Sequence, residues 1–225
     1  MAEPVGRTVL LAGATSAAGL ALTRALLAAG ARVVATGRDP AKLAPLAALG
    51  AQTATLDLTD EQAVRELAAS LRGRGVAVDG VVHLVGGWRG GGGLAGQTEE
   101  DYRLLEQSLT ALRHVSRALD EDLRASPAGR LAIVSSTAVA RPLAGGANYA
   151  ALKAAAEAWT RAVAQGWAKA ARDAGAAPRA AAVVLRVKAL DGLEERLAQE
   201  VVGLWSADPA ELNDSIRTID QKGTH

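Results

Sequence analysis

The sequence predicts one α/β domain spanning residues 1–225, with a mostly parallel seven-stranded sheet, doubly wound so that helices cover both faces. A length of 225 residues suits a single domain with a sizeable core. Short apolar runs alternate along the whole chain with longer Ala- and Leu-rich stretches of helical period. This alternation favours right-handed β-α-β crossovers, and no internal repeat or second-domain signal interrupts it.

The predicted elements follow from two periodicities. Short runs rich in Val, Leu and Ile are predicted strands: 7–12, 31–37, 51–57, 79–85, 129–136, 179–187 and 215–219. Intervening stretches with helical apolar spacing are predicted helices: 17–29, 40–49, 60–73, 98–124, 147–174 and 192–205. Capping chemistry supports two boundaries, with Thr59 or Asp60 as an N-cap and Gly30 at a helix end.

Composition narrows the class of partner. A net charge of +1, from 25 basic and 24 acidic residues, gives no bias toward nucleic acid or an anionic membrane. The absence of cysteine excludes disulfides, zinc-thiolate sites and cysteine nucleophiles, and the three histidines are too scattered for a metal cluster. The first apolar run is too short for a signal peptide or a membrane span. We therefore expect a cytoplasmic protein with a small-molecule substrate, no metal, and no nucleic-acid or membrane partner.

The first strand-to-helix turn has the composition of a dinucleotide site. Two glycines bracket small residues at the start of a helix, where free N–H groups and the helix dipole favour a pyrophosphate. The alternative is an ordinary glycine-containing connection, but its place as the first β-α unit favours a Rossmann-type cofactor site. Cofactor contacts are expected from the turn residues Gly13, Thr15, Ser16, Ala17, Ala18 and Gly19.

The end of the second predicted strand indicates which cofactor binds there. A cofactor without a 2′-phosphate is usually held by a carboxylate at this place, but the sequence offers Arg38. A guanidinium pairs well with phosphate, so NADP(H) is expected in preference to NAD(H). The alternative for Arg38 is a solvated side chain at a helix start. Asp57, after the third strand, is expected either to receive the adenine amino group or to cap the next helix.

A Ser/Tyr/Lys set points to proton-transfer chemistry. Tyr149 and Lys153 are four residues apart at a helix start and share one face, and Ser136 ends the preceding strand. A phenol has a pKa of about 10, and a nearby ammonium lowers it toward neutral pH. A strand-end hydroxyl can hold the substrate oxygen. An isolated Tyr-x-x-x-Lys is common by chance, but its combination with Ser136 and a nucleotide turn is not.

These motifs resemble the short-chain dehydrogenases/reductases over nearly the whole chain. "AGATSAAG" (12–19) resembles that family's Thr-Gly-x-x-x-Gly-x-Gly turn, and "HLVG" (83–86) stands where it has Asn-Asn-Ala-Gly. The resemblance implies that Ser136 orients a carbonyl or alcohol, Tyr149 exchanges the proton, and Lys153 binds the nicotinamide ribose. It also implies a homodimer or homotetramer. Further cofactor contacts are expected at Leu58, Leu84, Val85, Gly86 and Val187.

The sequence departs from the family pattern in two places. Ser108 stands where the family commonly has an asparagine that supports a water-mediated proton path to the lysine. That path is therefore either lost or carried differently. The substrate-covering segment after the sixth strand is short or missing, which implies an open site or one covered from elsewhere.

The glycine run "HLVGGWRGGGG" (83–93) suggests a narrower resemblance. It could be a slack linker or a loop that approaches a ligand closely. Together with "QS" (107–108) and "VLRVKALDG" (184–192) it resembles dihydropteridine reductase, which implies a pterin-like substrate. Arg38 and Ser136 depart from that subfamily and favour an NADPH-dependent carbonyl reductase. Trp88 is either a flat wall for a planar substrate or a packing residue.

Other notable residues have plainer interpretations. His83 and His114 are expected to be packing or surface residues, and Arg179, Arg186 and Lys188 to flank an exposed strand edge, with Arg186 a possible substrate contact. Trp159 and Trp167 should share one helix face as core or subunit-interface anchors.

Two functions follow from the whole sequence. The first is an NADP(H)-dependent oxidoreductase acting on a carbonyl, an alcohol or a pterin-like ring. The alternative is a non-catalytic NADP(H)-binding sensor or scaffold on the same fold.

Overall fold

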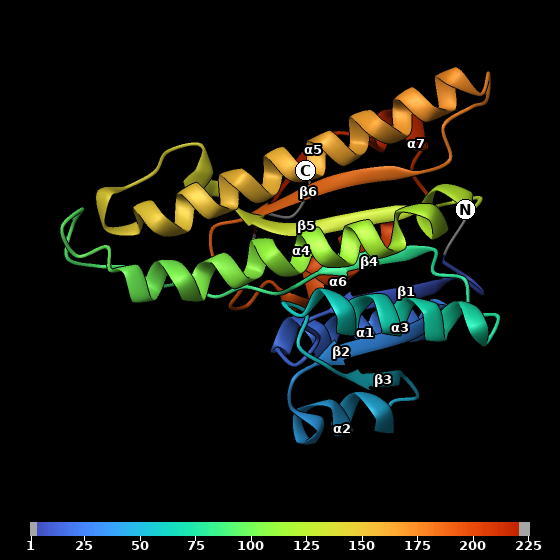
Figure 1. Cartoon of the computed structure of the whole chain (residues 1–225), viewed down its shortest axis with the longest axis horizontal. Helices are drawn as coiled ribbons and strands as arrows, with labels where there is room; N and C mark the ends of the chain where they lie inside the picture. Colours follow the sequence, from blue (N-terminus) through green and yellow to red (C-terminus); the bar gives the residue numbers. More distant parts are fainter. Residues whose placement is uncertain (1–3, 221–225) are drawn as a thin grey trace.

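The computed structural model describes residues 4–220, in which seven strands form one parallel sheet of order β3-β2-β1-β4-β5-β6-β7 (Figure 1). The strands are β1 (Thr8–Ala12), β2 (Arg32–Gly37), β3 (Gln52–Thr55), β4 (Gly80–His83), β5 (Arg130–Ser136), β6 (Ala181–Val187) and β7 (Ser215–Ile219). Every neighbouring pair is parallel. The predicted α/β class and strand number are confirmed, and no antiparallel strand occurs in the described sheet.

The strand order reverses direction between β1 and β4. From β1 the chain builds outward to β2 and β3, then crosses back to β4 on the other side of β1. Ala12 pairs with His83, and the Leu84 N–H donates to the Ala12 carbonyl at 2.8 Å. The loops after β1 and β4 therefore leave the sheet side by side, and this switch point is where open α/β sheets bind ligands.

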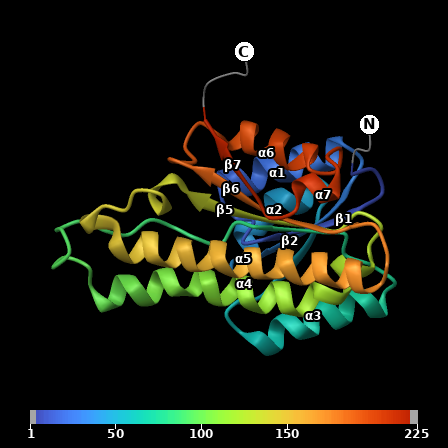
Figure 2. The same ribbon diagram turned by 90° about the horizontal axis from the view of Figure 1, so that it is seen from above.

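Two layers of helices enclose the sheet (Figure 2). One layer contains α1 (Ala17–Ala28), α2 (Pro40–Ala48), α6 (Glu194–Gly203) and the short α7 (Pro209–Leu212). The other contains α3 (Glu61–Gly73), α4 (Glu99–Ala125) and α5 (Ala147–Asp173). No helix within residues 4–220 combines the length and apolar character that crossing a membrane requires.

The alternation of side chains along each strand explains why the sheet has a hydrophobic core on each of its two faces. On β1, Val9 and Leu11 face the α1 side while Leu10 and Ala12 face the α4 side, as strand alternation requires. Three short elements were not predicted: the 3₁₀ turns η1 (Thr137–Val139) and η2 (Ala144–Gly146), and α7. Each is three or four residues long, which is too short to carry an apolar repeat.

The longest helices, α4 and α5, are joined by Trp159 and Trp167, which were predicted to share one helix face. Trp159 Nε1 donates to Ser116 Oγ at 2.9 Å, and Trp167 Nε1 donates to Asp120 Oδ1 at 2.6 Å. Both indole rings therefore lie on the α5 face toward α4, and their predicted shared face is confirmed. The contacts hold the two helices together within one chain.

Two helical glycines provide a matched test of this packing. A Cβ at Gly19 in α1 would lie 1.9 Å from the Ala14 carbonyl oxygen, whereas a Cβ at Gly166 in α5 would meet no atom within 4 Å. We expect Gly19→Ala to lower the free energy of unfolding by about 3 kcal/mol, because the turn after β1 must shift. Denaturant unfolding measures this change.

Gly166→Ala is the control. Alanine is the better helix former, so this variant should raise the free energy of unfolding by about 0.5–1 kcal/mol. Equal stability of the two variants would contradict the close approach of α1 to the first turn.

Candidate active site

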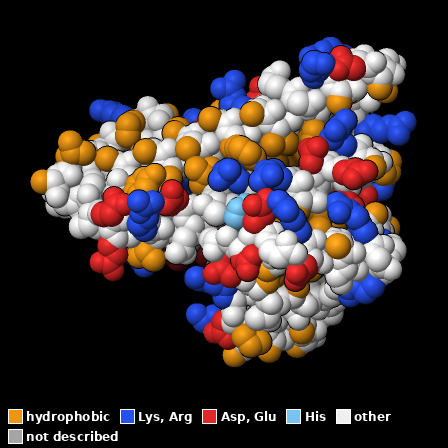
Figure 3. Space-filling model, viewed as in Figure 1, with side chains coloured by type: hydrophobic (Ala, Val, Ile, Leu, Met, Phe, Trp, Pro, Cys, Tyr) orange, Lys and Arg blue, Asp and Glu red, His pale blue; other side chains and the backbone are white. Residues whose placement is uncertain are grey.

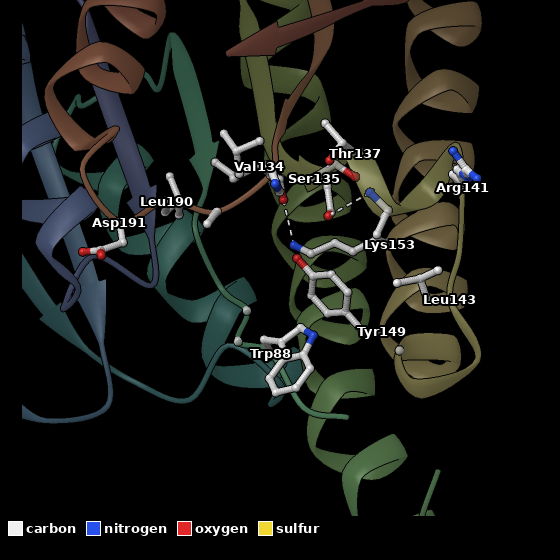
Figure 4. Close-up of a pocket in the computed structure, with 18 of the residues that line it drawn as sticks. Trp88, Val134, Ser135, Thr137, Arg141, Leu143, Tyr149, Lys153, Leu190 and Asp191 are labelled. Carbon is white, nitrogen blue, oxygen red and sulfur yellow. Dashed lines mark hydrogen bonds between the residues drawn. The ribbon is translucent and has the colours of Figure 1, made fainter. Parts of the chain in front are cut away.

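A cleft runs along the carboxyl edge of the sheet. Its larger part is a cavity of about 980 Å³ between the ends of β4, β5 and β6 and the start of α5 (Figure 4). A smaller groove of about 210 Å³ lies against the turn after β1 and the end of β2. Leu84 and Gly86 line both spaces, so the groove and the cavity adjoin at the loop after β4.

The turn after β1 forms an anion-binding helix start. Ser16 is the N-cap of α1 and accepts from the Gly19 N–H at 3.2 Å. In the described part of the chain, the Ala17 and Ala18 N–H groups have no acceptor. Free N–H groups at a helix start suit a pyrophosphate. The predicted turn residues thus fit a dinucleotide, although Ala18 itself is 3 % exposed.

The close approaches around this turn require glycine. Gly13 has a φ of +79°, and a Cβ there would lie 2.8 Å from the Val85 side chain. A Cβ on Gly37, at the end of β2, would lie 2.6 Å from the Thr15 side chain. The turn is therefore held tightly between β2 and the loop after β4, and its N–H groups are fixed in place.

Arg38 and Asp57 face the same groove. Arg38 is exposed, lines the groove, and has no hydrogen-bond or ion-pair partner within residues 4–220. Asp57 Oδ1 accepts from Thr59 N at 2.9 Å and Thr59 Oγ1 at 2.8 Å, and the bond from the Thr59 backbone holds its pKa below the usual value. The N-cap of α3 is Asp60, so of the two predicted caps Asp60 is correct.

Ser136, Tyr149 and Lys153 all line the large cavity, and Figure 4 shows Tyr149 beside Lys153. Ser136 ends β5, and its Oγ accepts from the Ala138 N–H at 3.1 Å. Lys153 Nζ lies 5.8 Å from the centroid of the Tyr149 ring and donates to the Val134 carbonyl at 2.7 Å. Burial lowers the pKa of Lys153 to about 8, against an opposing effect of the Glu157 carboxylate. The structure thus brings all three predicted residues together.

Glu157 extends the same face of α5 and was not predicted. It is 5 % exposed, accepts from Ser135 Oγ at 2.6 Å, and forms a two-bond ion pair with Arg186 of β6. The expectation of Arg186 as a solvated edge residue or a substrate contact was wrong, because the Glu157 carboxylate holds its guanidinium inside. Continuing the spacing of Tyr149 and Lys153 by four more residues would have found Glu157.

Ser108 is tied to the loop after β4 through two hydrogen bonds. Its Oγ donates to the Val85 carbonyl at 2.6 Å, and its own carbonyl lies 3.0 Å from His83 Nε2. A carbonyl only accepts, so Nε2 carries the proton and the buried Nδ1 has no partner. Burial lowers the pKa of His83 to about 3, so His83 is a neutral packing residue.

A space of about 10 Å³, enough for one water molecule, lies between Ser108, Tyr149 and Lys153. Because the Ser108 proton is directed to Val85, its hydroxyl offers this space an acceptor. Ser108, the position predicted for the proton relay, therefore lies next to Lys153. It offers a hydroxyl oxygen there in place of the family's asparagine amide.

The glycine run is a fixed loop. Gly91 N donates to the Gly145 carbonyl at 2.7 Å, and Gln97 Nε2 donates to the same carbonyl at 3.0 Å. Gln97 Oε1 also accepts from the Asn148 N–H at 3.1 Å. The loop therefore docks on the segment that precedes Tyr149 and borders the cavity, which excludes a slack linker. Trp88, in this loop, lines the cavity and is 61 % exposed.

Comparison with known proteins identifies the family. Residues 7–173 match the short chain dehydrogenase family. The chain belongs to this family. Over 89 residues it is 40 % identical to a proposed daunorubicin C-13 ketoreductase from Streptomyces sp., which covers 36 % of this chain and 31 % of that protein. The match thus spans about a third of this curated relative.

Solved structures share the fold over nearly the full chain. A gluconate 5-dehydrogenase from Burkholderia cenocepacia, in complex with NADP and tartrate, has a TM-score of 0.81 at 22 % identity and covers 96 % of this chain and 94 % of its own. A short chain dehydrogenase from the same organism, in complex with NADP, has a TM-score of 0.79 at 23 % identity, with 97 % and 98 % coverage. The predicted family and Rossmann-type fold are confirmed.

The neutral, buried His83 predicts a stability loss in acid. The unfolded histidine takes up a proton below about pH 6.5, whereas the folded one stays neutral until about pH 3. Unfolding therefore becomes more favourable as the pH falls through this window. The amide of His83→Gln can still donate to the Ser108 carbonyl. Between pH 7 and pH 4.5 we expect the free energy of unfolding of this variant to fall by about 2–3 kcal/mol less than that of the wild type.

Denaturant unfolding at the two pH values measures the difference. His114→Gln, at a half-buried position on α4, is the control for the same substitution elsewhere in the fold. If His83→Gln follows the wild type, His83 is not the group that takes up the proton on unfolding.

Proposed function

We propose that this chain is an NADP(H)-dependent oxidoreductase that transfers hydride between the nicotinamide and a carbonyl or alcohol carbon. The observation that carries the proposal is the meeting of Ser136, Tyr149 and Lys153 in a cavity that adjoins the dinucleotide groove. The alternative of a non-catalytic sensor gains no support from the site, because all three side chains face one substrate-sized space.

The chain's own groups would hold the cofactor along the cleft. The free N–H groups of Ala17 and Ala18 would bind the pyrophosphate, and Arg38 the 2′-phosphate. Lys153 would reach the nicotinamide ribose from α5. When bound, the nicotinamide gives or takes the hydride.

The three catalytic candidates have separate tasks. Because Ser136 Oγ already accepts from the Ala138 N–H, its own proton is available to the substrate oxygen. In reduction, the Tyr149 hydroxyl gives its proton to that oxygen as the alcohol forms. Lys153 is mainly protonated at pH 7, and its ammonium stabilises the negative charge that remains on Tyr149. The water-sized space beside Ser108 offers a route for the returning proton.

The substrate we infer is flat. The connection from β6 to α6 is only the few residues 188–193, so it forms no long cover over the cavity. Trp88 presents a largely exposed ring at the cavity wall. A planar carbonyl compound, including a pterin-like ring, suits such a wall, since aromatic faces stack with an offset.

The two tyrosines of the chain permit a direct test of the proton donor. Tyr149→Phe should lower kcat for NADPH-dependent carbonyl reduction by about 10²- to 10⁴-fold, because the acidic proton is lost. Tyr102→Phe, at a half-buried position near the start of α4 and outside the cavity lining, should keep the wild-type rate. The assay follows NADPH absorbance with a panel of aldehydes, ketones, quinones and quinonoid dihydropterin. Full turnover by Tyr149→Phe would refute its role, and NADPH binding without any turnover would favour the sensor.

The preference for NADPH has its own test. Arg38→Ala should weaken NADPH binding by about tenfold to a hundredfold and leave NADH binding unchanged, because only NADPH carries the 2′-phosphate. Calorimetric titration of both cofactors measures the ratio. Lys42→Ala removes an exposed charge on the adjoining α2 and should leave the ratio as in the wild type. An unchanged ratio in Arg38→Ala would exclude Arg38 as the phosphate ligand.

A further inference from the structure

Two arginines line the cleft without a hydrogen bond or an ion pair in the described part of the chain. Arg38 faces the cofactor groove, and Arg141 lines the large cavity. Other arginines near the cavity are already engaged, since Arg186 pairs with Glu157 and Arg89 contacts the Trp88 carbonyl and Asp101. Among the described residues, Arg141 is therefore the guanidinium that lines the substrate half of the cleft without a hydrogen bond or an ion pair.

The residues that flank Arg141 in the chain are apolar and mostly small. It lies between the turns η1 and η2, where the following Pro142 restricts the backbone. Exposed apolar side chains lie in this segment and in the glycine loop, where Leu143 is 74 % and Leu94 is 70 % exposed. Figure 3 shows hydrophobic side chains gathered at the end of the molecule where α4 and α5 begin. Figure 4 shows Arg141 on the side of Leu143, with Trp88 on the far side of Tyr149.

The acidic residue among those that line the cavity is Asp191, and it lies on the opposite side from Arg141 (Figure 4). Lys188 also lines the cavity, on the short connection after β6 that carries Asp191. Arg141 is exposed to solvent, and no hydrogen bond or ion pair within residues 4–220 compensates its charge. A ligand in this cavity would bind most favourably if it carried a negatively charged group that pairs with Arg141.

We propose that Arg141 binds a carboxylate of the substrate and that the substrate class is a planar carbonyl acid. This inference rests on the proposed function for the reacting carbonyl. The carbonyl lies at Tyr149 and Ser136, the flat body lies between Trp88 and Leu143, and the acid group pairs with Arg141. A guanidinium on a proline-restricted loop binds a carboxylate with two parallel hydrogen bonds, which fixes the orientation of the carbonyl.

Matched probes test the charge separately from the reaction. 4-Carboxybenzaldehyde and 4-formylbenzamide have nearly the same size and differ in charge. With the wild type and NADPH we expect kcat/KM to be at least about tenfold higher for the acid. Arg141→Gln should remove this preference by raising KM for the acid alone, and Arg141→Lys should restore part of it. Arg89→Gln, on the neighbouring loop, should keep the wild-type preference.

Binding of terephthalate to the protein with NADP⁺, measured by calorimetry, provides a readout without turnover. Binding that is lost in Arg141→Gln supports the acid site even if no aldehyde is reduced, in which case the proposed function alone fails. Reduction of both aldehydes with equal kcat/KM overturns the acid site and leaves the proposed function standing. An equal loss for both probes in Arg141→Gln, or neither binding nor turnover, also overturns the acid site.

Discussion

The contact between the end of β5 and one polar face of α5 is the constraint on which the site depends. Tyr149, Lys153 and Glu157 follow one another at intervals of four residues and face the last three residues of β5. Lys153 donates to the Val134 carbonyl, and Ser135 donates to Glu157. Ser136, the third, lines the cavity, and its hydroxyl accepts from the Ala138 N–H. A helix packed against a sheet usually buries apolar side chains. Each buried polar group on this face of α5 therefore needs a hydrogen-bond partner close by.

The ion pair between Glu157 and Arg186 extends this contact to β6. The guanidinium of Arg186 gives two hydrogen bonds to a carboxylate that is 5 % exposed, which joins β5, β6 and α5 at one level. Removing one partner of such a pair leaves a buried charge uncompensated, which costs far more than the pair itself contributes. The negative charge also favours the protonated form of Lys153 and opposes the burial that lowers its pKa. The pair thus connects the fold to the protonation of the site.

Much of the fold follows from the sequence, because strand and helix periods are local properties. The seven strands, the six long helices and the first glycine turn required only patterns within short windows. The Ser/Tyr/Lys set was also readable, since its spacing fixes a shared helix face and a strand end. The pairing of Arg186 with Glu157 could not be predicted from the sequence, because the two residues lie 29 positions apart on different elements and only packing brings them together. The docking of the glycine loop through Gln97 likewise needs tertiary contacts that no local pattern contains.

The protonation of Lys153 tests this view of the site most directly. The chain has few lysines, so the ¹³Cε resonance of Lys153 can be assigned by comparison with Lys153→Arg and followed by NMR as the pH is raised. A midpoint near pH 8 is expected, because burial against β5 outweighs the attraction of Glu157. A midpoint above about pH 10, the ordinary range of a solvated lysine, would contradict a buried ammonium held at the end of β5.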